Sequence, residues 1–285
     1  MAPVGVHLTA TPAFLRTPLL SRVVTEIPSP GLGTSGNDDH DQCAATVEAA
    51  IEMGYRHVDT AQMYDNEAAV GEGIERADVD REEVFLATKV HPENLAPEDV
   101  RRTAEESLDR LDVDHVDLLY VHWPTSAYDP ETTLPVFDDL YDAGKTRNVA
   151  VSNFTPALLD EAREILDAPV VANQVEVHPL LQQDDLRAYA SENDVTLVAY
   201  APILRGEAGD VPELREVAEK HDATPSQVSL AWLQAKDVVP IPKATGEQHL
   251  RENFDTPDLD DEDVATIDAI DRERRLIDPD AAPWN

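Results

Sequence analysis

The sequence contains one cysteine, Cys43, and no long hydrophobic run. A single cysteine excludes an internal disulfide and a metal site built from cysteine thiolates, which agrees with a reducing compartment such as the cytoplasm. No apolar stretch reaches the roughly 18 residues that a transmembrane helix needs. Near the N-terminus, Arg16 and two prolines interrupt the segment TPAFLRTPLL, which therefore lacks the core of a signal peptide. The composition predicts a soluble, cytoplasmic protein that does not bind membranes.

Basic residues are scarce as well. There are 22 Lys and Arg against 58 Asp and Glu, which gives a formal net charge of −36. A surface of this charge repels nucleic acids and anionic membranes, so neither is an expected partner. The acidic residues are spread between apolar runs along the whole chain, which argues against a disordered acidic tail. Because a Debye length of roughly 3 Å at about 1 M salt would screen their mutual repulsion, we interpret the composition as halophilic.

The pattern of hydrophobic residues predicts a barrel. Eight strand-like runs are expected at residues 31–34, 57–60, 84–89, 115–122, 148–153, 170–177, 196–200 and 238–243. Helices are expected near 39–53, 66–77, 97–110, 132–143, 155–166, 183–193 and 225–236, and Thr155 and Thr224, each followed by proline, are typical helix caps. The strands are too hydrophobic for a sheet with one solvated face, which predicts a single closed (β/α)8 barrel of the TIM type. We expect one domain over residues 1–285, with residues 1–20 as an N-terminal extension.

Two motifs that would favour other folds or reactions are missing. The sequence has no G-x-G-x-x-G, although an open, doubly wound sheet that binds a dinucleotide would favour this turn after one strand. It also has no G-x-S-x-G, the turn that exposes the nucleophilic serine of many hydrolases.

Each expected strand instead carries a polar or aromatic residue at or near its end, and strand ends form the active site of a parallel barrel. These residues are Thr34, Asp59, Lys89, His122, Asn153, Gln174, Tyr200 and Lys243. The set holds one carboxylate, two lysines and one histidine, whereas a metal centre needs several histidine or carboxylate ligands. The strand ends therefore predict an active site without a bound metal.

Six segments resemble the signature blocks of the aldo-keto reductases, in the order and spacing of that family. They are GYRHVDTAQMYDNEAAVGEGI (54–74), VFLATKV (84–90), LLYVHWP (118–124), VAVSNF (149–154), NQVEVHP (173–179) and IPKATGEQHLRENF (241–254). The short connections after His122 and Tyr200 resemble the compact microbial members. The resemblance implies a monomeric reductase that transfers hydride from NADPH, with NADH as a possible substitute, to a small aldehyde or ketone.

The resemblance also implies a catalytic tetrad, which consists of Asp59, Tyr64, Lys89 and His122. Tyr64 would be the general acid that protonates the carbonyl oxygen, and His122 would orient that oxygen. A phenol has an unperturbed pKa near 10, so we expect the charge of Lys89 to lower the pKa of Tyr64 while Asp59 holds the ammonium group.

A further set of residues is implied for cofactor and substrate. The cofactor set is Thr34, Ser152, Asn153, Gln174, Tyr200, Ile203, Lys243, Ala244, Thr245, His249, Glu252 and Asn253, and the substrate set is Ser35 and Trp123. Ser152, Asn153 and Gln174 resemble the residues that hold the nicotinamide carboxamide, and Tyr200 the aromatic that stacks on the ring. The loop 243–245 resembles the site of the adenosine 2′-phosphate, and residues 252–253 resemble the pair that reads the adenine.

Two positions depart from the family pattern. Where the family usually has arginine, this chain has His249, which predicts a moderate preference for NADPH. Where the family often has a bulky aromatic, this chain has Ser35, which predicts a wider or more polar substrate pocket.

Two other functions remain open at this point. A regulatory or binding protein on the same fold would keep the cofactor site with little turnover, although the intact tetrad argues against it. A hydrolase or isomerase on an unrelated barrel would show no absorbance change at 340 nm with any carbonyl.

Overall fold

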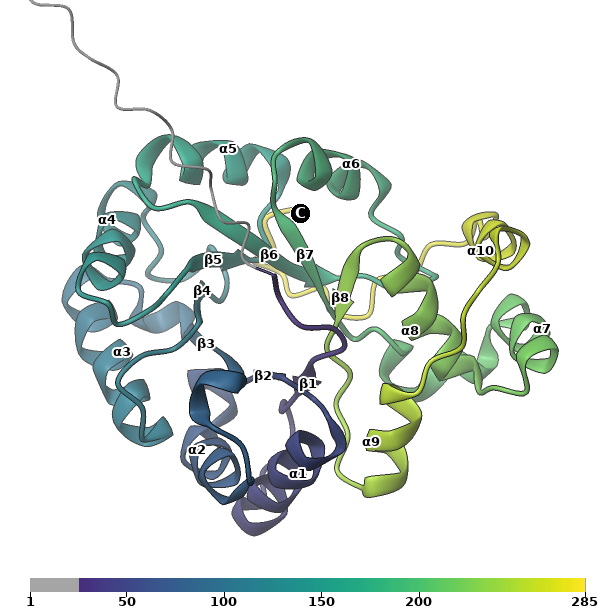
Figure 1. Cartoon of the computed structure of the whole chain (residues 1–285). Helices are drawn as coiled ribbons and strands as arrows, with labels where there is room; N and C mark the ends of the chain where they lie inside the picture. The colour runs from purple at the N-terminus through teal and green to yellow at the C-terminus, as the bar shows by residue number, and fades with distance from the viewer. Residues whose placement is uncertain (1–25, 285) are drawn as a thin grey trace, which may run out of the picture.

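The structure is a computed structural model that describes residues 26–284. The N-terminal extension expected at residues 1–20 lies outside the described residues. Within them, eight parallel strands form one sheet in sequence order (Figure 1). The strands are β1 (Leu32–Gly33), β2 (His57–Asp59), β3 (Phe85–Val90), β4 (Leu118–Val121), β5 (Val149–Ser152), β6 (Val170–Glu176), β7 (Thr196–Tyr200) and β8 (Val238–Pro240).

The first and last strands meet and close the sheet. A parallel bridge joins Gly33 to Lys243, and the Gly33 amide donates to the Pro242 carbonyl at 3.2 Å. A Cβ atom on Gly33 would lie 2.6 Å from the Ile241 carbonyl oxygen, so the close approach at this seam requires glycine. The predicted single (β/α)8 barrel is confirmed.

Helices surround the strands (Figure 1). They are α1 (His40–Met53), α2 (Glu67–Arg76), α3 (Pro97–Leu111), α4 (Pro130–Asp142), α5 (Pro156–Ile165), α6 (Asp184–Glu192), α7 (Pro212–His221), α8 (Pro225–Ala235), α9 (Glu247–Phe254) and α10 (Asp261–Asp268). The caps predicted at Thr155 and Thr224 are confirmed, because their hydroxyls accept from the amides of Leu158 and Gln227. Helices α7, α9 and α10 were not expected from the sequence. They have 8 to 10 residues and each buries only two or three side chains, so their apolar stripes are short.

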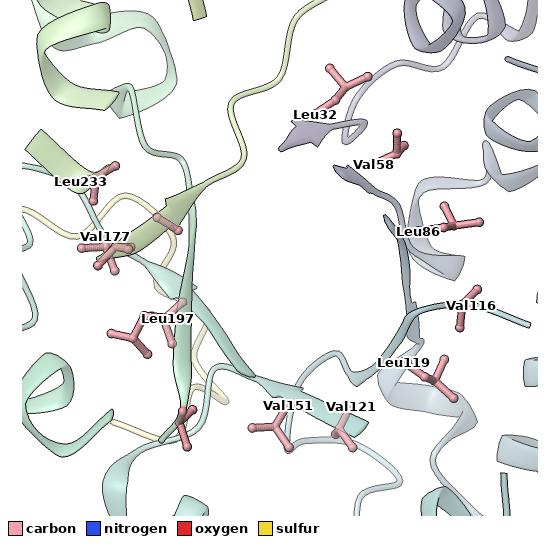
Figure 2. Close-up of a cluster of buried hydrophobic side chains, with 14 of the residues drawn as sticks. Leu32, Val58, Leu86, Val116, Leu119, Val121, Val151, Val177, Leu197 and Leu233 are labelled. Atoms are coloured by element: carbon pink, nitrogen blue, oxygen red, sulfur yellow. The ribbon is translucent and has the colours of Figure 1, made fainter. Parts of the chain in front are cut away.

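Alternation along the strands separates two hydrophobic layers. Side chains such as Leu32, Leu86 and Leu119 point outward from the ring of strands toward the helices (Figure 2). A second cluster, which includes Ala87 and Tyr120, fills the barrel interior. Because strand side chains alternate with a period of two, this pattern predicts that Lys89, two residues after Ala87, also faces the interior. The strands thus bring polar side chains to the end of an apolar barrel core.

Candidate active site

A buried ion pair lies at the ends of β2 and β3. The Lys89 Nζ donates to Asp59 Oδ1 at 2.5 Å and to the Thr60 carbonyl oxygen at 2.8 Å. Lys89 is fully buried and Asp59 is almost so. A charge at this depth requires a hydrogen-bonded partner of opposite sign, and Asp59 supplies it.

Tyr64 and His122 lie beside this pair. Tyr64 closes a short 3₁₀ helix (Gln62–Tyr64) that follows β2, and its hydroxyl is 3.4 Å from Lys89 Nζ. The ammonium also lies 4.9 Å from the centre of the Tyr64 ring. The ring of His122, just after β4, is 5.9 Å from the Tyr64 ring and meets it edge-on. The structure therefore brings together the four residues that the sequence predicted as catalytic.

The pKa of Tyr64 moves in the direction opposite to the one expected. Burial raises the pKa of Tyr64, and the opposing influence of the Lys89 charge is smaller. Lys89 does lower the pKa of Tyr64, as expected, but the expected net direction was wrong because the sequence could not show that the burial of the phenol outweighs this influence. Burial alone would lower the pKa of Lys89, but Asp59 and Tyr64 more than offset it and raise that pKa. At neutral pH the phenol therefore keeps its proton and the lysine its charge.

His122 is neutral at the same pH. Burial holds its pKa well below the ordinary value, and the charges of Lys89 and His91 act in the same direction. A neutral imidazole carries one N–H donor and one acceptor nitrogen. Its Nδ1 is buried and has no hydrogen-bond partner among residues 26–284. The ring is thus available as a neutral hydrogen-bonding group beside the phenol.

The second oxygen of Asp59 connects the ion pair to β6. Gln174 Nε2 donates to Asp59 Oδ2 at 2.8 Å, while Lys89 occupies Oδ1. The Ser152 hydroxyl, at the end of β5, donates to the Gln174 carbonyl oxygen at 2.8 Å. One carboxylate therefore orients both the ammonium group and an amide that was predicted to bind the cofactor.

Asn153 and Tyr200 extend this network. Asn153 has a φ of 64°, in the left-handed region that Asn tolerates better than most residues. Its Nδ2 donates to the His122 carbonyl oxygen at 3.1 Å and to Ser152 Oγ at 3.0 Å. The Tyr200 hydroxyl donates to Asn153 Oδ1 at 2.8 Å, and Tyr200 is half-buried at the end of β7. Amide, hydroxyl and aromatic groups gathered in this way suit a nicotinamide ring, whose carboxamide needs both donors and acceptors.

Two other predicted cofactor residues lie at this end of the barrel. Thr34 is buried, and its hydroxyl donates to the Asp59 carbonyl oxygen at 3.0 Å. Ile203 is half-buried in the connection that follows β7, three residues after Tyr200.

A separate group of predicted cofactor residues lies at the start of α9. Lys243 is exposed and forms no ion pair with any described residue, whereas Ala244 is buried and Thr245 half-buried. Helix α9 begins after Gly246, whose N-cap position supplies no side-chain acceptor for the first amides. An exposed lysine next to uncapped helix amides suits a phosphate group.

The predicted adenine pair is not brought to one face of α9. Asn253 is buried, while Glu252 is half-buried and accepts from Gln248 Nε2 at 2.7 Å. His249 is 68 % exposed, and its Nδ1 is 3.9 Å from Glu252 Oε2. The outer face of α9 therefore presents His249 and Glu252, and Asn253 faces inward.

The two predicted substrate residues border the tetrad. The Ser35 side chain is exposed and is among the influences that lower the pKa of Tyr64. Trp123 follows His122 directly, and its ring lies 5.8 Å from that of Trp284.

Sequence reasoning missed the contribution of the chain end, residues 271–284, which we call the C-terminal strap. Glu176, at the end of β6, is fully buried and accepts the amides of Leu276 at 2.6 Å and Ile277 at 2.8 Å. His178 Nε2 lies 2.9 Å from the same carboxylate. Glu176 and His178 stand in the NQVEVHP segment, but only Gln174 was singled out there. A charged residue at the end of a strand with no cation nearby in the sequence was the available signal.

Sequence reasoning also missed Tyr120. It pairs with Lys89 in the register of β3 and β4, and its ring centre lies 5.8 Å from Lys89 Nζ. The ammonium group is thus flanked by two tyrosine rings, a favourable arrangement for a buried cation.

Comparison with known proteins decides the family. Residues 30–272 match the sequence profile of the Aldo/keto reductase family. The chain belongs to the aldo-keto reductases. It is similar to the glyoxal reductase of Bacillus subtilis, with 38% identity over 88% of this chain and 91% of the relative. It is also 38% identical to the methylglyoxal reductase DkgB of Escherichia coli O157:H7, over 91% of this chain and 99% of the relative.

Solved aldo-keto reductases have the same fold. One of them, crystallised in complex with NADPH, superposes with a TM-score of 0.82 at 32% identity, over 90% of this chain and 88% of that one. In residues 26–284 no helix is long and apolar enough to cross a membrane. The same residues hold no group of three or more His, Cys, Asp or Glu side chains arranged to bind a metal.

Proposed function

We propose that this aldo-keto reductase reduces small aldehydes or ketones to alcohols with NADPH, and that Tyr64 is the general acid. The observation that carries the proposal is the contact of the Tyr64 hydroxyl with a fully buried, charged Lys89. A pure sensor of the cofactor has no need of a proton donor held in this way.

Each residue of the site has a distinct role in the proposed reaction. When bound, the reduced nicotinamide supplies the hydride. Tyr64 donates its proton to the carbonyl oxygen, and the Lys89 ammonium, 3.4 Å away, stabilises the phenolate that remains. Asp59 fixes the position of the ammonium, and neutral His122 hydrogen-bonds to the carbonyl oxygen. The carboxamide is held by Ser152, Asn153 and Gln174, so that one face of the nicotinamide ring meets the substrate.

The proposal is tested with a panel of carbonyl compounds that includes glyoxal and methylglyoxal. In high salt, oxidation of NADPH is followed at 340 nm with and without each compound. We expect carbonyl-dependent oxidation with at least one of them. Cofactor binding without oxidation by any compound would instead support the binding-protein alternative, and the absence of both would place the chain outside carbonyl reduction.

Cofactor choice depends on the start of α9. The 2′-phosphate is nearly a dianion, and exposed Lys243 offers it a point charge, while His249 carries only a partial charge near neutral pH. We expect kcat/KM for NADPH to exceed that for NADH by about tenfold to a hundredfold, or about 1.4–2.8 kcal/mol. Lys243→Gly should nearly remove this preference, and His249→Arg should increase it, chiefly through a lower KM for NADPH.

The measurement is kcat/KM for both cofactors in the wild type and both variants at one fixed salt concentration. Lys145→Gly is a control, because it removes a lysine in the connection before β5, outside the residues assigned to the cofactor. Equal use of NADH and NADPH by the wild type, or an unchanged ratio in Lys243→Gly, would contradict this position for the phosphate.

The acidic surface supports a further part of the proposal, namely that the enzyme works in a high-salt cytoplasm. Lowering KCl from about 1 M to about 0.1 M lengthens the Debye length to roughly 10 Å and restores repulsion among 58 acidic residues. We expect a markedly lower melting temperature in the dilute buffer, measured by circular dichroism. NaCl at equal ionic strength is the control, because an effect of screening alone should be the same with either salt. A melting curve that does not respond to salt would contradict the salt adaptation.

A further inference from the structure

Tyr64 lies on a segment that has few backbone hydrogen bonds of its own. The 3₁₀ helix Gln62–Tyr64 has three residues, and its middle residue, Met63, is exposed. The Tyr64 amide donates to the Ala61 carbonyl oxygen at 3.0 Å, and the Asp65 amide donates to the Gln62 carbonyl oxygen at 3.3 Å. A helix this short has weak internal bonding, so the position of the Tyr64 hydroxyl depends on what anchors the segment from outside.

Gln62 anchors the segment to two neighbouring elements. Its Nε2 donates to the Thr103 carbonyl oxygen at 3.0 Å and to Ser107 Oγ at 3.1 Å, both on α3. Its Oε1 accepts from the His91 amide at 2.9 Å and from Asn94 Nδ2 at 3.1 Å, in the connection after β3. The amide therefore makes four hydrogen bonds, two as donor and two as acceptor, which is all that a glutamine side chain can make.

Polar side chains outside the barrel wall continue these bonds to β3. Figure 1 shows α2 and α3 side by side next to β3. Ser107 Oγ also accepts from Arg110 Nη2 at 3.1 Å, and Arg110 donates to Glu67 Oε2 through Nε at 2.8 Å and through Nη2 at 2.6 Å. The other oxygen of Glu67 accepts from Thr88 Oγ1 at 2.5 Å. One unbroken series of hydrogen bonds thus runs from Gln62 to β3.

The two ends of this series lie next to the two groups of the proposed proton donor. Gln62 is two residues before Tyr64, and Thr88 directly precedes Lys89. Because side chains alternate along a strand, Thr88 faces the helices while Lys89 faces the barrel interior. Buried polar groups whose hydrogen bonds are all made give a rigid local structure. We call the series the outer network, which consists of Gln62, Glu67, Thr88, Ser107 and Arg110.

We propose that Gln62 is a positioning residue, which through the outer network keeps the Tyr64 hydroxyl at the distance from Lys89 that proton transfer requires. The inference rests on the proposed reductase function, because it assigns Gln62 to the support of the same proton donor. The Gln62 amide has no donor or acceptor left for a substrate or cofactor, so its effect passes through Tyr64. A displacement of about 1 Å at a reacting group can lower a rate about 100-fold.

Gln62→Met tests the Tyr64 end of the outer network. The substitution keeps an unbranched side chain of similar length and removes all four hydrogen bonds. We expect the rate of NADPH oxidation in a single turnover to fall by about tenfold to a hundredfold, while the Kd for NADPH changes by less than about twofold. In the Tyr64→Phe background, the same substitution should cause no further loss of rate, and a further loss there would overturn the proposal.

Thr88→Val tests the other end with a smaller change, and it keeps the proposal open to refutation if Gln62→Met does not fold. Only the hydroxyl that donates to Glu67 is removed, and we expect the same rate to fall by about threefold to tenfold. Gln234→Met is the matched control. It removes a half-buried glutamine of α8 that accepts from Thr256 Oγ1 at 2.9 Å, outside the outer network, and should leave the rate within about twofold.

A spectroscopic measurement separates this inference from the reductase function. The protein has seven tyrosines, and after ¹³C labelling at Cζ the NMR signal of Tyr64 is the one absent from Tyr64→Phe. At neutral pH we expect Gln62→Met and Thr88→Val to move this signal and Gln234→Met to leave it in place. If the signal moves in this way while the wild type reduces no carbonyl compound, the support of Tyr64 by Gln62 stands and the reductase proposal fails. If the wild type is active and both variants keep its rate and its Tyr64 signal, the positioning role is overturned and the reductase proposal stands.

Discussion

Tyr64→Phe should lower kcat for carbonyl reduction by about 10²–10⁴-fold while cofactor binding changes little. The phenylalanine ring keeps the packing beside His122 and Lys89 and removes only the hydroxyl that lies 3.4 Å from Lys89 Nζ. The measurement is kcat for a compound that the wild type reduces, together with the Kd for NADPH from fluorescence titration.

Tyr141→Phe is the control for this variant. Tyr141 lies on α4 and the residue is 37% exposed, so loss of its hydroxyl should leave kcat within about twofold. Retention of more than a tenth of the wild-type kcat by Tyr64→Phe would rule out Tyr64 as the acid.

Lys89→Met should reduce kcat to a similar extent and should also change its dependence on pH. The charge of Lys89 opposes the rise in the pKa of Tyr64, so its removal raises that pKa further. The phenol becomes a weaker acid, and it loses its proton at a higher pH than in the wild type. The alkaline limb of the kcat profile, where the acid is deprotonated, should therefore move to higher pH.

The fold of this variant needs its own check, because Asp59 loses its buried partner and such a loss costs about 3–5 kcal/mol. Circular dichroism and NADPH binding report on the fold, and Lys89→Arg, which keeps the positive charge, should move the alkaline limb less than Lys89→Met does. An alkaline limb that stays in place in folded Lys89→Met would show that Lys89 does not act on the proton donor.

The strand ends could be predicted because they depend on local patterns. Strand-like hydrophobic runs, separated by helix-like segments, place Asp59, Lys89 and Gln174 near the carboxyl ends of three strands. A closed parallel barrel brings such ends together at one end of the barrel. In the structure, Asp59 accepts hydrogen bonds from both Lys89 and Gln174. Their roles in catalysis and cofactor binding stay predictions.

The strap could not be predicted in the same way. The bond from Leu276 to Glu176 joins residues that are 100 positions apart, and no local pattern signals such a contact. The direction of the Tyr64 pKa failed for a related reason. Charges are visible in a sequence, but the depth of burial that outweighs the Lys89 charge appears only in the folded chain.

The two oxygens of Asp59 determine how freely the enzyme can be redesigned. Because one oxygen accepts from Lys89 and the other from Gln174, a substitution at Gln174, the proposed contact of the nicotinamide, would also disturb Lys89, which is proposed to act on the proton donor. These three positions would have to be changed together. Lys243 is exposed and takes part in neither of these two hydrogen bonds, so the proposed phosphate site can be changed independently of them. A change of cofactor preference through residues near α9 is therefore a separate engineering problem from a change of the reaction at Asp59, Lys89 and Gln174.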